Sequence, residues 1–483
     1  MKRNLKNKLF LFLFCIVCRT AATQTQDVFT LEQAVDYGLE HSHLIKQVKS
    51  QLEQSQHYLR AWQKSYNSYA NLEAYAPVFT NRFAEIPDPE TGKIRIVRQN
   101  HTSYRSSLII SQPILLTDGT LSLANSLYHL RQADEATYQY DVVLNFNQPI
   151  FKTSTRKIDL KQAALNLRQA KLAYQNQKRE LVLFITQEYL NVLRSQRNLE
   201  IAQETAQRSR EVYDLALAKY RTGLYSEMDL LSFEVDVAND ENTLITQSEN
   251  LQQLQEAFKL TIGMQRDAKL GLLSMPDADS ITISYQELFR KALQNNPEKI
   301  IKDINLELDD LGIKRTKAAR EFSIDMNLEY GFSQIKDDFT SLFKQPEMIQ
   351  IANVRFSVPL WDSGQNKERV LAAREQLYES TIALDYSIES LKVEVREILL
   401  SLENARQRLA ISKNTEINAQ KSYQYRLLQF NAGSITSDEL TLARNRLNTA
   451  SLNHLNAQIE HLLALERIKK HLTEIQDDEN KEK

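Results

Sequence analysis

Apolar residues recur at intervals of three and four positions over long stretches of the chain, which is the spacing of one face of an α-helix. Neither Pro nor Gly interrupts the first stretch, from Arg156 to Arg221, and good helix formers such as Leu, Ala, Gln and Glu dominate it. The pattern predicts long helices over 156–221 and 366–432, each about 100 Å long at 1.5 Å per residue. Shorter helices are predicted over 226–263 and 437–473.

Other segments alternate apolar and polar residues with a period of two, which predicts β-strands with one apolar face. In the second half of the chain these strands cover about 323–333 and 349–359, and in the first half the alternation covers 70–76 and 142–147. The polar positions that we single out are Asp325, Asn327, Glu329, Asn353, Arg355, Asn145 and Asn147. Alternation alone fits both a half-buried soluble sheet and a membrane barrel. Long helices are predicted for the rest of the chain, so no globular core is expected to cover the apolar faces. This favours the membrane barrel, in which lipid covers them.

The chain contains an internal duplication. With a shift of 210 positions, Phe146 aligns with Phe356 and Leu230 with Leu440 in one register without gaps. Farther upstream the matching shift is 254, as for Leu72 and Met326, so the first half carries about 44 additional residues within 80–140. We predict a first repeat over 23–275, a second over 280–473 and a charged tail over 474–483. Each repeat is expected to run helix, strand, strand, long helix, turn, helix.

Composition and charge narrow the possible functions. The 483 residues include only 10 Gly and 9 Pro, which argues against Gly-rich nucleotide-binding loops. The chain has 60 basic and 62 acidic side chains, so no basic field for nucleic acid is expected. Residues 1–22 are predicted to be a cleaved secretory signal peptide, because four basic residues within the first eight positions precede an apolar run of ten. Both Cys residues, Cys15 and Cys18, lie in this run, and bulky Val17 argues against a lipoprotein signal at Cys18.

No catalytic motif is present, and the sequence indicates no enzyme activity, no cofactor and no metal site. His41 and His43 are two positions apart on a predicted helix, so their side chains point in opposite directions and do not suit a shared metal. Asp277 and Asp279 are interpreted as part of a solvated linker between the repeats. An exported helical hydrolase therefore finds no support in the sequence.

The two turns between long helices share one pattern. Gly223 and Gly433 follow the long helices, and Gly is the residue that most readily adopts the left-handed conformation of a helix C-terminus. Three positions later, Ser226 or Thr436 begins the spacing of a capping box. Both repeats are therefore predicted to end in the same sharp helical tip.

These features together resemble the TolC family of bacterial outer-membrane efflux proteins. The matching segments in the strands are Phe146–Phe151 and Phe356–Gly364, those at the tips are Tyr220–Ser226 and Phe430–Thr436, and Phe29–Ala34 matches the start of the first helix. The resemblance covers essentially the whole chain after the signal peptide. The departure is the 44-residue insertion, whose Ser107–Pro113 segment and Asp118-Gly119 turn resemble an additional hairpin.

The resemblance implies a fold that is mainly α with a small β part. Long antiparallel helical hairpins would form a periplasmic tunnel, and two duplicated β-hairpins would contribute four strands per chain to a 12-stranded barrel of a homotrimer in outer-membrane lipid. It implies a passive channel for efflux or type I secretion that meets a periplasmic adaptor (membrane fusion) protein and, through it, an inner-membrane pump. The candidate docking residues are Gly223, Leu224, Ser226, Gly433, Ser434 and Thr436, and the polar strand positions would face the lumen. The alternative is a soluble exported coiled-coil scaffold.

Overall fold

The computed structural model describes residues 27–87, 92–132, 135–223, 225–268, 270–272, 275, 281–432 and 434–474. The predicted signal peptide, most of the predicted linker and tail, and the tip residues Leu224 and Gly433 lie outside the described residues. The chain divides into two units. The first comprises the described residues up to 51, residues 172–299 and those from 386 onward, and the second comprises 52–171 and 300–385.

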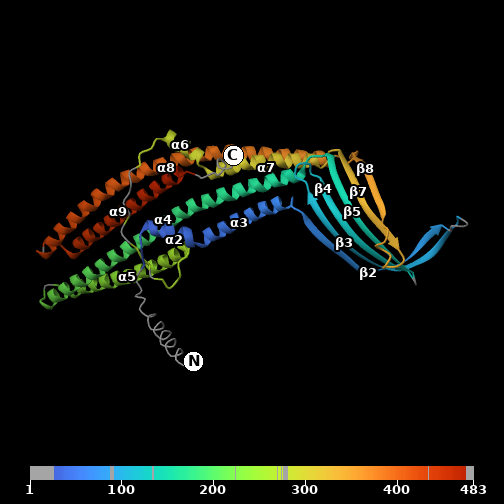
Figure 1. Cartoon of the computed structure of the whole chain (residues 1–483). Coiled ribbons are helices and arrows are strands. Elements are labelled where there is room, and N and C mark those ends of the chain that lie inside the picture. Colours follow the sequence, from blue (N-terminus) through green and yellow to red (C-terminus); the bar gives the residue numbers. More distant parts are fainter. Residues whose placement is uncertain are drawn as a thin grey trace, which may run out of the picture. The chain divides into compact units, whose positions relative to one another are not determined.

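Helices make up most of the described chain (Figure 1). They are α2 (Leu31–His41), α3 (His43–Lys64), α4 (Thr155–Arg221), α5 (Glu227–Ile262), α6 (Tyr285–Gln294), α7 (Pro297–Ala318), α8 (Gln365–Asn431) and α9 (Ser437–Leu472). The four helices whose bounds we predicted begin and end within one residue of the expected positions. Among the described residues, no helix is both long and apolar enough to cross a membrane.

Local sequence explains where several helices begin. At the start of α2, the Thr30 hydroxyl accepts a hydrogen bond from the backbone N–H of Gln33, and the Gln33 side chain accepts one from the backbone of Thr30. Ser284 caps α6 through the backbone N–H of Glu287. These side chains satisfy N–H groups that have no partner within the helix.

Six antiparallel strands form one sheet in the second unit, in the order β2-β3-β4-β5-β7-β8. The strands are β2 (Tyr69–Pro87), β3 (Ile94–Pro113), β4 (Thr120–Gln132), β5 (Glu135–Phe151), β7 (Ser323–Lys336) and β8 (Glu347–Ser357). The expected fold class, mainly helical with a smaller β part, is confirmed. The expected strand number is wrong, because the chain contributes six strands to the sheet and not four. The insertion supplies β3 and β4, which lie between the two first-half strands that we had expected to form a hairpin.

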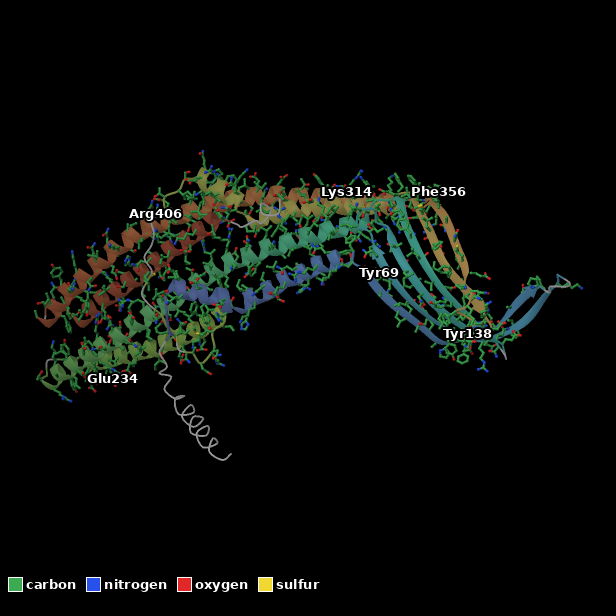
Figure 2. The ribbon with its side chains drawn as sticks, viewed as in Figure 1. Tyr69, Tyr138, Glu234, Lys314, Phe356 and Arg406 are labelled. Atoms are coloured by element: carbon green, nitrogen blue, oxygen red, sulfur yellow. The ribbon has the colours of Figure 1, made fainter. Side chains whose placement is uncertain are left out.

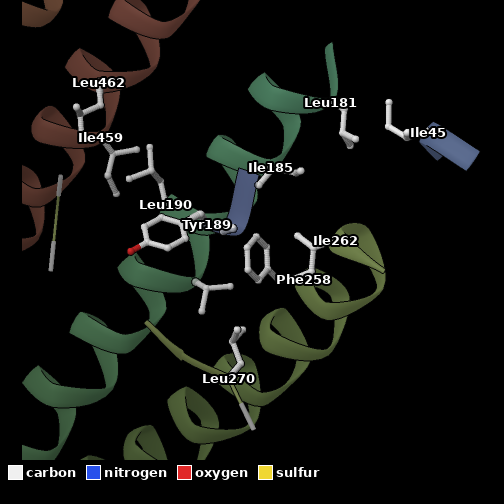
Figure 3. Packing of buried hydrophobic residues seen from close by; sticks show 12 residues of the cluster. Ile45, Leu181, Ile185, Tyr189, Leu190, Phe258, Ile262, Leu270, Ile459 and Leu462 are labelled. Carbon is white, nitrogen blue, oxygen red and sulfur yellow. The ribbon is translucent and has the colours of Figure 1, made fainter. Parts of the chain in front are cut away.

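The helices of the first unit pack around two apolar cores. In one core, Leu181, Ile185 and Tyr189 of α4 meet Phe258 and Ile262 of α5, and all five are fully or almost fully buried (Figure 3). Residues of α2, α3 and α9 complete this core. The other core joins α6, α8 and α9. A short parallel pair, β1 (Asp27–Phe29) and β6 (Leu270–Leu272), also belongs to this unit.

Within the second unit, polar contacts join the helices in addition to buried apolar side chains such as Ile158 of α4 and Leu311 of α7. Arg315 of α7 pairs with Asp159 of α4 at 2.8 Å, and Gln169 of α4 donates to Asn305 of α7. Arg320 pairs with Asp362 at 2.9 Å, just before α8 begins. Such pairs between partly exposed groups fix the relative orientation of the helices but contribute little to the free energy of folding.

Candidate functional site

The two faces of the six-stranded sheet differ in chemistry. Residues directly opposite each other in neighbouring strands point to the same face. Asn145 lies opposite Glu329 and Asn147 opposite Asn327, while Asp325 lies opposite Arg355 and Asn327 opposite Asn353. All seven polar positions that the sequence singled out therefore share one face, which we call the polar face.

Hydrogen bonds connect side chains along the polar face. Asn327 donates to Glu329 at 2.9 Å, and Ser333 of β7 donates to Asp141 of β5 at 2.6 Å. The inserted strands are joined on this face by a cation–π contact, because Arg105 of β3 lies over the Tyr128 ring of β4 at 5.4 Å. Polar side chains on this face thus come from first-half, inserted and second-half strands, although one row across it is apolar, with Ile109, Val143 and Ile349.

The opposite face, which we call the apolar face, is the more exposed one. In β7 the side chains of Leu328, Tyr330 and Phe332 are exposed, Tyr330 to 51%, whereas Asp325, Asn327 and Glu329 are half-buried. The helices that connect to this sheet, α3, α4, α7 and α8, extend away from its end and do not lie over its faces (Figure 1). Apolar side chains that point outward without a cover are the opposite of the usual arrangement in soluble proteins and are typical of a surface that faces lipid.

Aromatic residues mark both ends of the apolar face. Figure 2 shows Phe356 at the end of the sheet that joins the helices and Tyr138 at the other end, and both belong to the apolar face. At Tyr138 the rings of Tyr104, His129 and Tyr138 stack in a row across three strands, with centroid distances of 5.8 and 4.4 Å. Aromatic girdles flank the apolar band of outer-membrane barrels. Sequence reasoning missed this row because its members come from strands of the insertion and its neighbour.

The first helical tip has the predicted geometry at its glycine. Gly223 has a φ of +78°, and its N–H donates to the Tyr220 carbonyl at 2.9 Å. The backbone N–H of Leu230 donates to the Ser226 carbonyl at 3.3 Å, so Ser226 stands directly before α5. Leu224 lies outside the described residues, and so does the Asp229 side chain that was expected to complete the capping box.

The second tip contains the predicted capping box. The Thr436 hydroxyl accepts from the Glu439 N–H at 3.4 Å, and the Glu439 carboxylate accepts from the Thr436 N–H at 3.2 Å. The Ser434 N–H donates to the Gln429 carbonyl at 2.9 Å, which is the outer hydrogen bond of a Schellman motif. Gly433, between these partners, lies outside the described residues.

One lysine connects the two tips. The Lys219 ammonium lies 5.1 Å from the centre of the Tyr225 ring at the first tip and 5.4 Å from that of Phe430 at the second. Beyond this contact the first tip presents apolar side chains to solvent, including Leu231 and Met228, which is 77% exposed. The sequence did not single out Lys219 or Met228, because neither stands out within a helix of mixed polarity.

A polar network links α4 and α5 to α9 near the tips. Arg444 of α9 donates to the Ser209 hydroxyl of α4 at 2.9 Å and lies 3.6 Å from the Asp240 carboxylate of α5. Ser209 also donates to Asp240. Burial raises the pKa of the neighbouring Asp236 carboxyl, an effect that Arg444 partly opposes and Asp240 reinforces. Sequence reasoning missed this network, because no local pattern connects residues so far apart along the chain.

The described residues contain no group of three or more His, Cys, Asp or Glu side chains that could hold a metal ion. His41 makes a local contact instead, since its ring stacks on Tyr37 at 4.2 Å.

Comparisons with known proteins agree with this geometry. A family model described as "Outer membrane efflux protein" matches residues 94–264 and 288–473. The outer membrane protein TolC of Vibrio cholerae is 23% identical over 372 residues, which are 75% of this chain and 82% of that protein.

Solved structures show the same fold. A membrane protein from Pseudomonas aeruginosa matches with a TM-score of 0.72 and 14% identity, covering 93% of this chain and 91% of its own. The CmeC outer membrane channel of Campylobacter jejuni matches with a TM-score of 0.71 and 14% identity, covering 92% and 85%. Because the family model spans most of the sequence and both predicted repeats, this chain belongs to the outer membrane efflux protein family and is an efflux channel of the outer membrane.

Proposed function

We propose that three copies of this chain pool their sheets into one barrel, with the polar face toward the lumen and the apolar face toward lipid. The observation that carries this proposal is the exposure of Leu328, Tyr330 and Phe332 beside the half-buried Asp325, Asn327 and Glu329. A sheet with two unpaired edges is not stable in hydrocarbon, because each open backbone group would lack a hydrogen-bond partner. Joining copies edge to edge satisfies these backbone groups and closes the three sheets into one barrel around the pore.

The lumen would conduct substrates passively. Asn, Ser and Gln side chains offer both hydrogen-bond donors and acceptors to a passing hydrated solute. Asp325 and Arg355 carry opposite charges, so no strong preference for cations or anions is expected. Transport through such a pore makes and breaks no covalent bond, so no catalytic residue is required. The energy would come from an inner-membrane pump, which reaches the channel through a periplasmic adaptor.

The adaptor would dock at the two helical tips. The candidates remain Gly223, Leu224 and Ser226 at the first tip, and Gly433, Ser434 and Thr436 at the second. The exposed Met228 and Leu231 support this placement, because apolar side chains on an exposed helical turn suit the helical end of a protein partner.

Membrane fractionation followed by mass measurement tests this proposal. We expect the protein in the outer-membrane fraction, released by detergent as a particle with the mass of three chains. Recovery in the periplasm without detergent would favour a soluble coiled-coil scaffold. A monodisperse monomer that still conducts ions would contradict the trimer.

A further inference from the structure

The two strands of the insertion have the same two faces as the four other strands. On the apolar face, Leu108 of β3 and Leu123 of β4 are 41% and 42% exposed. On the polar face, Ser107 of β3 lies opposite Ser126 of β4, and Ser111 lies opposite Ser122. Inserted strands that lay in solvent outside the membrane would not need one polar and one apolar face.

These strands also extend to the end of the sheet that joins the helices. The turn between β3 and β4 is held there by three contacts. The Ile114 N–H donates to the Gly119 carbonyl at 2.8 Å, Gln148 donates to the Thr117 carbonyl at 2.8 Å, and Lys157 of α4 donates to the Leu116 carbonyl at 3.1 Å. Every residue of β4 is paired with both β3 and β5. The insertion is therefore fully integrated into the six-stranded sheet.

The free edges of the sheet belong to β2 and β8. All five ladders are antiparallel, so β2 and β8, at the two ends of a six-stranded order, run in opposite directions. The edge of β8 in one copy can therefore continue as an antiparallel ladder onto β2 of the next copy.

We propose that each chain contributes all six strands to the transmembrane wall, so that the trimer closes as an 18-stranded barrel through β8–β2 pairing between copies. This inference rests on the proposed trimer. Barrel diameter grows roughly linearly with strand number, so at equal tilt this pore is about one and a half times as wide as one with four strands per chain.

Threefold symmetry restricts how the barrel closes. The stagger is the number of residues by which the pairing moves along the strands when the ladder passes from one copy to the next, and it is the same for all three copies. It is an even number, because an odd one would join a polar face to an apolar face. At about 3.3 Å per residue and 4.8 Å between strands, a stagger of six or eight residues per chain tilts the strands by about 35° or 43°. Both values match the tilt of known barrels, about 35–45°.

The observed ladders convert this stagger into residue pairs. Ladder partners followed across the sheet from Asn353 are Asn327, Asn147, Thr120 and Pro113. One more step reaches position 67, just before β2 begins. A stagger of six places Asn353 opposite Glu73 of the next copy, and a stagger of eight places it opposite Tyr75.

We assign the stagger of six, because it also aligns the first residue of β2 with the last residue of β8. Tyr69 then lies opposite Ser357 and Asn71 opposite Arg355, all on the polar face. Leu72 and Val354 meet on the apolar face, so the exposed apolar surface continues from one copy to the next.

Disulfide cross-linking in outer membranes tests the pairing, with Cys15 and Cys18 replaced by Ser in every variant. The double variant Glu73→Cys/Asn353→Cys is expected to give a ladder of covalent dimers and trimers on a non-reducing gel. The matched control Ser122→Cys/Asn353→Cys joins β8 to an interior strand and is expected to give monomers only. A ladder from the control, or none from either Glu73→Cys or Tyr75→Cys combined with Asn353→Cys, would overturn the proposal.

Electron microscopy of the intact protein in lipid nanodiscs gives an independent result. We expect a trimer whose wall contains eighteen strands. A trimeric pore with twelve strands would overturn this inference and leave the proposed function intact, whereas particles without a transmembrane pore would contradict the proposed function itself.

Discussion

The two halves of the chain match in their helices and differ in their strands. The long helices α4 and α8 both have 67 residues, α5 and α9 both have 36, and α3 and α7 both have 22. In contrast, the first half contributes four strands to the sheet and the second half two. These three pairs of helices have thus kept equal lengths, and α2 and α6 differ by one residue, whereas the number of strands has doubled in the first half.

Packing geometry explains this difference. Two helical hairpins that contact each other near their tips, as through Lys219 and Arg444, stay in register only if their lengths match. An antiparallel sheet accepts an additional hairpin between two of its strands, because each strand pairs only with its immediate neighbours. The sheet therefore accommodates the insertion without a change in the lengths of the long helices.

The largest expected effect concerns the apolar face. Replacing Leu328 of β7 by Arg is expected to cost about 2–4 kcal/mol of folding free energy in lipid if the site lies near the midplane. Leu123→Arg in β4 should cost a similar amount if the inserted strands also face lipid. Replacing Asn327 or Ser122 by Arg should cost far less. Urea unfolding in lipid vesicles measures all four, and equal costs on both faces would contradict the assignment.

The next effect concerns a contact that the two halves do not share. Arg444→Met removes the cationic partner of the largely buried Asp240 and the donor to Ser209, which should destabilise the packing of α9 on α4 and α5 by about 1–3 kcal/mol. The equivalent first-half position is Glu234, which is exposed, so Glu234→Met is a matched control with little expected effect. Hydrogen exchange of α9 distinguishes the two. Equal protection in both variants would show that the network is not structural.

A smaller effect is expected at the first tip. An added Cβ at Gly223 meets no atom within 4 Å, so the cost of Gly223→Val comes from the φ of +78° alone, about 1–2 kcal/mol. We expect lost efflux or secretion with the protein still inserted in the outer membrane. Gly223→Asn should retain transport, because Asn tolerates positive φ. Gly312→Val in α7 is the control for the added side-chain volume, because Gly312 does not have a positive φ.

Docking at both tips is tested by the double variant Gly223→Val/Gly433→Val. Normal transport together with normal adaptor cross-linking in this variant would show that the tips are not the docking site.

The smallest effect is a pH dependence confined to the second half. Burial lowers the pKa of His461, with a further contribution from Arg406. The unfolded chain therefore binds a proton at this residue more readily, so the stability contributed by neutral His461 is complete above about pH 6.5 and is lost as the pH falls. The equivalent first-half residue is Leu251. Replacing His461 by Leu should flatten the fall in melting temperature between pH 7 and pH 5, and an unchanged profile would contradict this.

Periodicity was sufficient to predict the helices and the polar face. The absence of Gly and Pro from 156–221 indicated a helix that the structure extends by one residue, and alternation at Asp325, Asn327 and Glu329 placed them on one face. The positive φ of Gly223 and the capping box of Thr436 also follow from local residue chemistry. The functional roles of these residues remain predictions.

The features that sequence reasoning missed depend on contacts between distant residues. The additional hairpin expected from Ser107–Pro113 and the Asp118-Gly119 turn is present as β3 and β4, but its full length was missed, because only pairing with β2 and β4 makes residues 94–113 one strand. The short pair β1 and β6 joins segments more than two hundred residues apart. The network of Ser209, Asp240 and Arg444 is created by packing, and no local pattern predicts it.

The central claim, that the polar face lines a pore through the outer membrane, is tested most directly by current recordings across a planar bilayer. Asn327→Cys and Leu328→Cys are compared in protein whose Cys15 and Cys18 are replaced by Ser, before and after a charged thiol reagent is added. The account predicts that the reagent changes the current through the Asn327→Cys channel and leaves the Leu328→Cys channel unaffected. An effect at Leu328→Cys without one at Asn327→Cys, or protein that carries no current, would contradict it.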